Sequence, residues 1–144
     1  MSEENVEIAR RLFEAARESF ERGDPGAWVD LDAVSEDYEW VLAGGLTRVD
    51  LGGRTVFRGR EEYEEFFRTW MAEFDEYSFK LDRLIDAGDD QVVAIAHQRG
   101  VGKGSGAPIE WQMGQVLQFE GGRLIRTRIY ASPAEALEAA GLSE

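Results

Sequence analysis

Few side chains in this 144-residue sequence could carry out acid–base or nucleophilic chemistry. There is no cysteine and one histidine, His97, which excludes thiol nucleophiles, disulfides and cysteine-ligated zinc. Histidine titrates near neutral pH and suits proton transfer, yet the expected neighbours of His97 show no sign of a catalytic triad. The other candidate bases are Asp37, Glu39 and Asp50, near the first expected strand and its loop. The direction of these carboxylates cannot be obtained from the sequence.

Metal and phosphate sites find little support. One histidine and no cysteine leave only oxygen-rich metal sites, and no loop has the spacing for one. The glycine-rich stretch 100–106 lacks the spacing of a phosphate-binding loop and lies between expected antiparallel strands. We therefore predict a protein with no metal and no cofactor.

A glutamine interrupts the apolar row of the expected strand 108–120. Side chains alternate between the two faces of a strand, so Trp111, Met113 and Leu117 share one face, which should point inward. Gln115 lies on that same face. Because an unpaired buried amide costs about 1–3 kcal/mol, Gln115 needs a partner. The partner of Gln115 is either a buried backbone group or water, or a ligand that accepts a hydrogen bond.

The expected strand 91–101 is apolar on both faces at its start, so periodicity alone does not choose the inner face. The small side chains of Ala94 and Ala96 favour a face that leaves room for a ligand, and Gln98 continues that row. This choice places His97 on the outer, more polar face of the strand.

The last expected strand, 123–131, supplies a third inner row. Ile125, Thr127 and Ile129 form this row, and Arg126 and Arg128 lie on the other face.

The elements that must position these side chains predict an α+β domain. Apolar residues spaced by three and four predict a helix over 3–22. Asp24 followed by Pro25 predicts an N-cap and first position of a short second helix through Leu31. A strand over 37–42 follows. The glycine-rich stretch 44–53 is either a loop or a hairpin.

The second half of the chain repeats strand signals. A third helix begins near Arg60 and carries an aromatic stripe that indicates core packing: Tyr63, Phe66, Phe67, Trp70, Met71 and Phe74. Four strands follow, at about 77–86, 91–101, 108–120 and 123–131. Ser132, Pro133 and Glu135 predict the capped start of a C-terminal helix, which Gly141 ends.

The composition limits the partners. There are 29 acidic and 16 basic residues, with a formal net charge of −13, which disfavours nucleic acid and anionic membranes. No apolar run approaches the roughly 20 residues that cross a bilayer, and the acidic N-terminus is unlike a signal peptide. Without repeats or linkers, we expect a single domain over 1–144 in the cytoplasm.

Several segments together resemble the SnoaL-like branch of the nuclear transport factor 2-like superfamily. They are Glu21–Asp24, Asp37–Trp40, Phe57–Glu61, Gly121–Ile125, Ile129–Tyr130 and Ala134–Gly141. The resemblance implies a cone-shaped fold in which N-terminal helices pack against a curved antiparallel sheet and enclose a pocket. It also implies homodimers formed through the outer face of the sheet.

Proteins of this superfamily include polyketide cyclases, ketosteroid isomerase, limonene epoxide hydrolase and binding modules without catalysis. By resemblance, the acid–base aspartate of the cyclases falls at Ile129 and that of ketosteroid isomerase at Leu42. The oxyanion-hole aspartate of ketosteroid isomerase falls near Gln115, whose amide still donates a hydrogen bond. An isoleucine or leucine cannot remove a proton, so the family's general bases are missing.

The epoxide hydrolases of this fold use an arginine and two aspartates, with a tyrosine and an asparagine that hold the water. By resemblance, the charged groups fall approximately at Ala96, Gln98 and Ile129, and the water-holding pair at Trp40 and Leu42. None of these five positions has the required group.

The leading hypothesis is a protein that binds a small apolar molecule, cyclic and similar to a polyketide, steroid or terpenoid. The expected ligand-binding residues are Trp40, Ala96, Gln98, Trp111, Met113, Gln115, Thr127 and Ile129. If the protein is an enzyme, it is a cofactor-independent isomerase, cyclase or hydrolase with Gln115 as an oxyanion donor. The alternatives are a non-catalytic binding module and a dimeric structural protein whose cavity is incidental.

Overall fold

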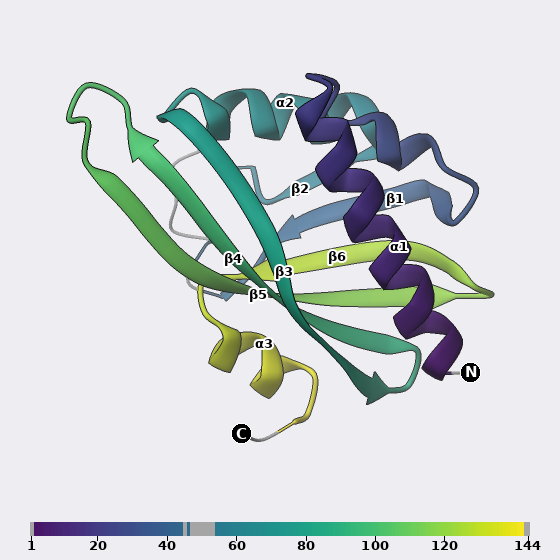
Figure 1. Cartoon of the computed structure of the whole chain (residues 1–144). Helices are drawn as coiled ribbons and strands as arrows, with labels where there is room; N and C mark the ends of the chain where they lie inside the picture. The colour runs from purple at the N-terminus through teal and green to yellow at the C-terminus, as the bar shows by residue number, and fades with distance from the viewer. Residues whose placement is uncertain (1, 45, 47–53, 143–144) are drawn as a thin grey trace.

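Helices and strands follow the predicted order in the computed structural model, which describes residues 2–44, 46 and 54–142 (Figure 1). The helices are α1 (Ser2–Glu21), α2 (Gly59–Met71) and α3 (Pro133–Ala139), with a 3₁₀ helix η1 (Ala27–Asp30). The strands are β1 (Val34–Leu42), β2 (Val56–Arg58), β3 (Phe74–Gly88), β4 (Gln91–Gly102), β5 (Pro108–Glu120) and β6 (Arg123–Tyr130). The predicted α+β class is confirmed.

The sheet is mixed, and the prediction of an antiparallel sheet is wrong at one pair. Its six strands have the order β2-β1-β6-β5-β4-β3. Short turns connect the consecutive strands β3, β4, β5 and β6, so each of these strands runs antiparallel to the next. In contrast, β1 pairs with β6 in parallel. No turn joins β1 to β6, since most of the chain lies between them. Their relative direction is therefore set by tertiary packing.

Irregular register bends the sheet. β3 shifts register against β4 at three places along its 15 residues, and such bulges bend a strand and increase its twist. Another shift lies between Gln118 and Phe119 of β5, which pair with Arg126 and Leu124 of β6 and leave Ile125 between them. There Leu124, which is 1% exposed, joins the inner core in place of Ile125. The predicted inner position of Ile125 is wrong because this bulge reverses the alternation.

The two faces of the sheet carry separate cores. On the inner face, α1 and α2 cover a large cluster that includes Val92 and Ala94 of β4. On the outer face, α3 covers a smaller cluster that includes Val93 and Ile95. Figure 1 shows α1 crossing the sheet, α2 at one end of it, and α3 apart from both. Both faces of β4 begin apolar because each is buried under a different helix.

The predicted helix ends agree with the observed ones only in part. The hydroxyl of Ser132 accepts a hydrogen bond from the backbone N–H of Glu135, as predicted for the start of α3. Asp24 is not an N-cap: η1 starts after Gly26, and the Asp24 carboxylate binds Arg60 at 2.6 Å. Phe74 belongs to β3, so the predicted aromatic stripe of the third helix ends earlier, at Met71.

Most of the glycine-rich stretch 44–53, expected to form a loop or a hairpin, lies outside the described residues.

Within the described ranges, no helix has the length and apolar character to cross a membrane.

Candidate ligand-binding cavity

A cavity of about 70 Å³ lies inside the cone, between α1, α2 and the inner face of the sheet. Its wall is apolar and rich in aromatic rings. None of the described residues that line it is Asp, Glu, Lys, Arg or His. The described part of the wall therefore carries no formal charge, which favours uncharged ligands because an unpaired buried charge is costly.

Seven of the eight predicted ligand-binding residues line this cavity. They are Trp40, Ala96, Gln98, Met113, Gln115, Thr127 and Ile129. Trp111 does not line it. Its ring is stacked on Phe74 at 5.8 Å and meets Trp70 edge-on at 6.2 Å. Strand alternation identified the inner row of β5 but not where along the row the cavity ends, and the binding role of these residues stays a prediction.

Other lining residues come from elements that the sequence did not assign to the cavity. α1 contributes Leu12, Phe13, Ala16 and Phe20, the apolar stripe that predicted the helix. That stripe was a signal for burial, but it could not distinguish a cavity wall from filled core. Trp28 of η1 and Trp70 of α2 also line the cavity.

The Trp40 indole is held by three aromatic rings of α2. Its centroid lies 5.0 Å from Tyr63, 5.4 Å from Phe67 and 5.8 Å from Phe66. The contact with Tyr63 is edge-to-face, a geometry that aromatic pairs favour. Trp40 is 6% exposed, so its ring has little freedom to turn.

Most polar side chains at the cavity are paired with one another. The hydroxyl of Tyr38 donates to Oγ1 of Thr127 at 2.7 Å, and the indole N–H of Trp28 donates to the Tyr63 hydroxyl at 3.0 Å. The Tyr77 hydroxyl donates to Oε1 of Gln98 at 2.6 Å. These bonds satisfy polar groups that would otherwise destabilise an apolar interior.

Two polar groups at the cavity lack such partners. Within the described chain, Nε1 of Trp40 is buried without a hydrogen-bond partner. The Gln115 side chain, in a residue 8% exposed, also has no hydrogen bond to the described residues, but its amide is not fully buried. Buried polar groups in native proteins are nearly always satisfied, so these two cavity-lining groups stand out from the paired ones.

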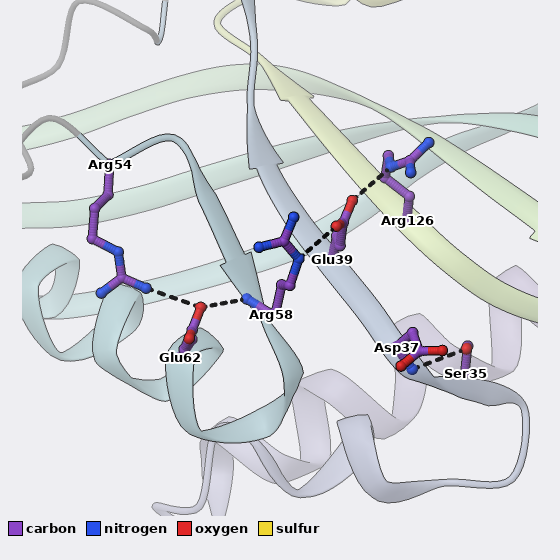
Figure 2. Close-up of polar contacts among 7 residues, drawn as sticks. All are labelled: Ser35, Asp37, Glu39, Arg54, Arg58, Glu62 and Arg126. Atoms are coloured by element: carbon purple, nitrogen blue, oxygen red, sulfur yellow. Dashed lines mark hydrogen bonds and ion pairs between the residues drawn. The ribbon is translucent and has the colours of Figure 1, made fainter.

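The candidate carboxylates of β1 point away from the cavity. Trp40 faces the inner core, so Glu39, its neighbour in the strand, faces outward. Figure 2 shows Glu39 between two arginines, with 2.8 Å to Nε of Arg58 and 3.0 Å to Nε of Arg126. These arginines, Arg126 first, hold the pKa of Glu39 below its ordinary value. Glu39 is thus an ionised structural residue.

Asp37 and His97 do not line the cavity either. Asp37 is exposed, and its backbone N–H bonds the hydroxyl of Ser35 on the same strand (Figure 2). His97 lies on the predicted outer face, 3.4 Å from Glu110, which also pairs with Arg99. Asp50 lies outside the described residues.

Tyrosine hydroxyls are the only acidic groups on the described cavity wall. Burial raises the pKa of both Tyr63 and Tyr77 above the ordinary value, so their hydroxyls stay neutral at physiological pH. They can donate or accept hydrogen bonds but do not act as general bases near neutral pH.

Comparison with known families agrees with this geometry. The sequence profile of the SnoaL-like domain matches residues 9–127, from α1 to Thr127 of the cavity wall. The chain belongs to the SnoaL-like domain family. No curated protein matches it.

Solved structures similar to this SnoaL-like domain show its fold. An NTF2-like protein of unknown function from Burkholderia pseudomallei is 24% identical, covers 94% of this chain and 95% of its own, and has a TM-score of 0.68. TerC, co-crystallised with polyporic acid, is 17% identical with the same TM-score, and the coverage is 96% and 98%.

A third similar structure is a protein with a ketosteroid isomerase-like fold from Catenulispora acidiphila, in complex with trimethylamine. It is 20% identical, the match covers 83% of this chain and 81% of that one, and the TM-score is 0.56. At these identities the three likenesses support the cone-shaped fold and carry no information about this chain's ligand.

Proposed function

We propose that this SnoaL-like domain binds a small, uncharged, hydrophobic molecule in the cavity of its cone. The observation that supports this proposal is the lining: described side chains without a formal charge, interrupted by the unpartnered amide of Gln115. An apolar wall with a few polar groups is the usual composition of a small-molecule site. Aromatic rings such as Trp40 and Phe66 suit a cyclic ligand of the polyketide, steroid or terpenoid kind.

The cavity must widen to hold a ring system. Its volume of about 70 Å³ is small beside the roughly 300–1,000 Å³ of typical ligand pockets. Met113 has three flexible torsions and adapts readily to a new neighbour, so it is the lining residue that we expect to move. Binding of a larger ligand should therefore change the environment of Met113.

Catalysis in this cavity would depend on hydrogen-bond donors. Leu42 and Ile129, which occupy the positions of the family's aspartates by resemblance, both line the cavity and carry no proton-accepting group. The specific observation that favours a cofactor-independent isomerase or cyclase is the free amide of Gln115. It could stabilise an oxyanion as charge develops on a substrate carbonyl. Non-catalytic binding needs no further group and is the function that the geometry supports best.

Thermal unfolding in the presence of candidate ligands tests the proposal. The panel contains steroids, terpenoid epoxides, aromatic polyketides and polyporic acid, and native mass spectrometry identifies any molecule that co-purifies. We expect at least one uncharged cyclic compound to raise the melting temperature in a concentration-dependent way. No stabilisation by any compound, together with no co-purified molecule, would favour a structural protein with an incidental cavity.

A pair of variants locates the binding site. Ala96→Leu adds bulk at the cavity wall and should weaken binding of any compound found. Ala87→Leu makes the same change at a position packed against the outer-face core and should leave binding unchanged. Equal effects of the two substitutions would place the ligand elsewhere.

The oligomeric state of the protein and its location in the cell remain predictions. A homodimer formed through the outer sheet face predicts sedimentation at twice the chain mass of 16.2 kDa. Location in the cytoplasm can be checked by fractionation of the cells that produce the protein.

A further inference from the structure

Trp40 carries a buried hydrogen-bond donor that the described part of the chain does not satisfy. Its Nε1 makes no hydrogen bond, although the residue is 6% exposed and lines the cavity. An indole N–H can donate but not accept. Its missing partner must therefore be a hydrogen-bond acceptor.

Among the described residues, one other fully buried side-chain polar atom lacks a partner, Nε of Arg128, and Arg128 does not line the cavity. Trp28, a second indole on the cavity wall, donates to Tyr63 at 3.0 Å, and Tyr38 donates to Thr127 at 2.7 Å. The fold thus supplies partners for these polar groups around the cavity. An unpaired donor beside such bonds indicates a position kept for a ligand.

The Trp40 ring is held in place before any ligand arrives. Tyr63, Phe66 and Phe67 surround the Trp40 ring at centroid distances of 5.0–5.8 Å. A donor held by packing loses little freedom on binding, which favours selective recognition.

A second donor lies nearby on the same concave surface. Trp40 pairs in register with Thr127 of β6, and Thr127 pairs with Leu117 of β5. Gln115 is two residues from Leu117 and shares its inner face. Neighbouring strands are about 5 Å apart, so β1 and β5, on either side of β6, are about 10 Å apart. A ligand must therefore span this distance, shortened by the length of the two side chains, to reach both Trp40 and Gln115.

We propose that the Trp40 indole N–H donates a hydrogen bond to a carbonyl oxygen of an uncharged cyclic ligand, with the Gln115 amide as a second donor. This inference rests on the proposed function and names the substrate class of the same cavity. A carbonyl accepts without bringing a donor of its own, so it needs no acceptor from the cavity wall. A carboxylate is disfavoured because no described lining residue is cationic.

Three probes with one ring skeleton test the inference: 1-indanone, 1-indanol and indane. Dissociation constants are measured by calorimetry for the native protein, for Trp40→Phe and for Trp28→Phe. Trp28→Phe is the matched control, because its indole N–H already has a partner in Tyr63. We expect Trp40→Phe to weaken 1-indanone about three- to tenfold more than indane. Trp28→Phe should affect both compounds equally.

A measurement on the native protein avoids dependence on the variant's folding. The four tryptophans give four indole N–H signals in a ¹⁵N-correlated NMR spectrum, assigned with the tryptophan variants or by through-space contacts. Added 1-indanone should move the Trp40 Hε1 signal downfield, and indane should not.

The outcomes separate this inference from the proposed function. If the probes bind but Trp40→Phe weakens 1-indanone and indane equally, or the Trp40 signal moves alike with both, the carbonyl contact is wrong and cavity binding stands. If 1-indanol alone shows the Trp40-dependent effect, the ligand class is an alcohol and the inference is overturned. If none of the three binds, cavity binding itself fails for molecules of this size.

Discussion

The Tyr77 hydroxyl donates a 2.6 Å hydrogen bond to Oε1 of Gln98 across the pairing of β3 with β4. Gln98 in turn donates through Nε2 to Sδ of Met113 on β5, a weak acceptor. Gln98 is therefore a glutamine with structural partners, whereas Gln115 on the same wall has none among the described residues. The two amides should respond to substitution in opposite ways.

Tyr77→Phe should destabilise the protein by about 1–3 kcal/mol, because it leaves the buried Oε1 of Gln98 without a donor. Urea unfolding of Tyr77→Phe, Gln98→Leu and the double variant measures the coupling between the two residues. We expect the double variant to lose less than the sum of the single losses. Additive losses would show that the bond is not formed in solution.

Gln115→Leu should preserve or increase stability, by up to about 1 kcal/mol, because it replaces an amide that has no hydrogen bond to the described residues with an apolar group of similar size. The same substitution should weaken ligand binding. Gln98→Leu is the matched control and should lower the free energy of unfolding. A large loss of stability in Gln115→Leu would contradict a ligand role, since it would show that Gln115 has a structural partner.

Glu39→Gln should lower stability at neutral pH by up to about 1 kcal/mol, because it weakens pairs with two arginines that are 41% and 69% exposed. The folded pKa of Glu39 lies below its ordinary value of 4.5. Its contribution is therefore present above that pH and is lost as the pH falls through the folded pKa. The difference in unfolding free energy between native protein and variant should shrink below about pH 4.5. A difference independent of pH would exclude the ionised pairs as its cause.

Gly114→Ala should destabilise the protein by roughly 2 kcal/mol through overpacking. A Cβ at this position would lie 2.5 Å from the Cβ of Ala136 and 3.0 Å from the backbone oxygen of Ser132. Since Ala136 is fully buried in α3, the helix would have to shift from the sheet. Chemical unfolding measures the loss, and hydrogen exchange should show reduced protection in α3. Unchanged protection would mean that α3 packs elsewhere.

Local sequence signals predicted much of the fold. Alternation in β5 identified Met113, Gln115 and Leu117 as one inner row, and the Ser132 cap identified the start of α3. These features depend on residues a few positions apart, so a single sequence contains them. The absence of the family's aspartates was also predicted from the sequence, by resemblance, at Leu42 and Ile129. Both of these residues line the cavity.

Other features depend on residues far apart in the chain. The parallel pairing of β1 with β6 arises from packing between strands that are far apart in the sequence. The bulge that turns Leu124 inward in place of Ile125 lies within the β5–β6 hairpin, but regular alternation along one strand does not reveal it. For the same reason no local pattern showed that the α1 stripe forms part of the cavity wall.

The amino-acid sequence by itself determined an α+β domain with an apolar inner face, two glutamines on that face, and no general base at the family's positions. Only the tertiary structure decided that Gln98 is paired while the indole N–H of Trp40 is not. The physical reason is that hydrogen bonding of a buried side chain depends on which distant residues fold against it. Periodicity along a strand gives the face of a residue but not its partner.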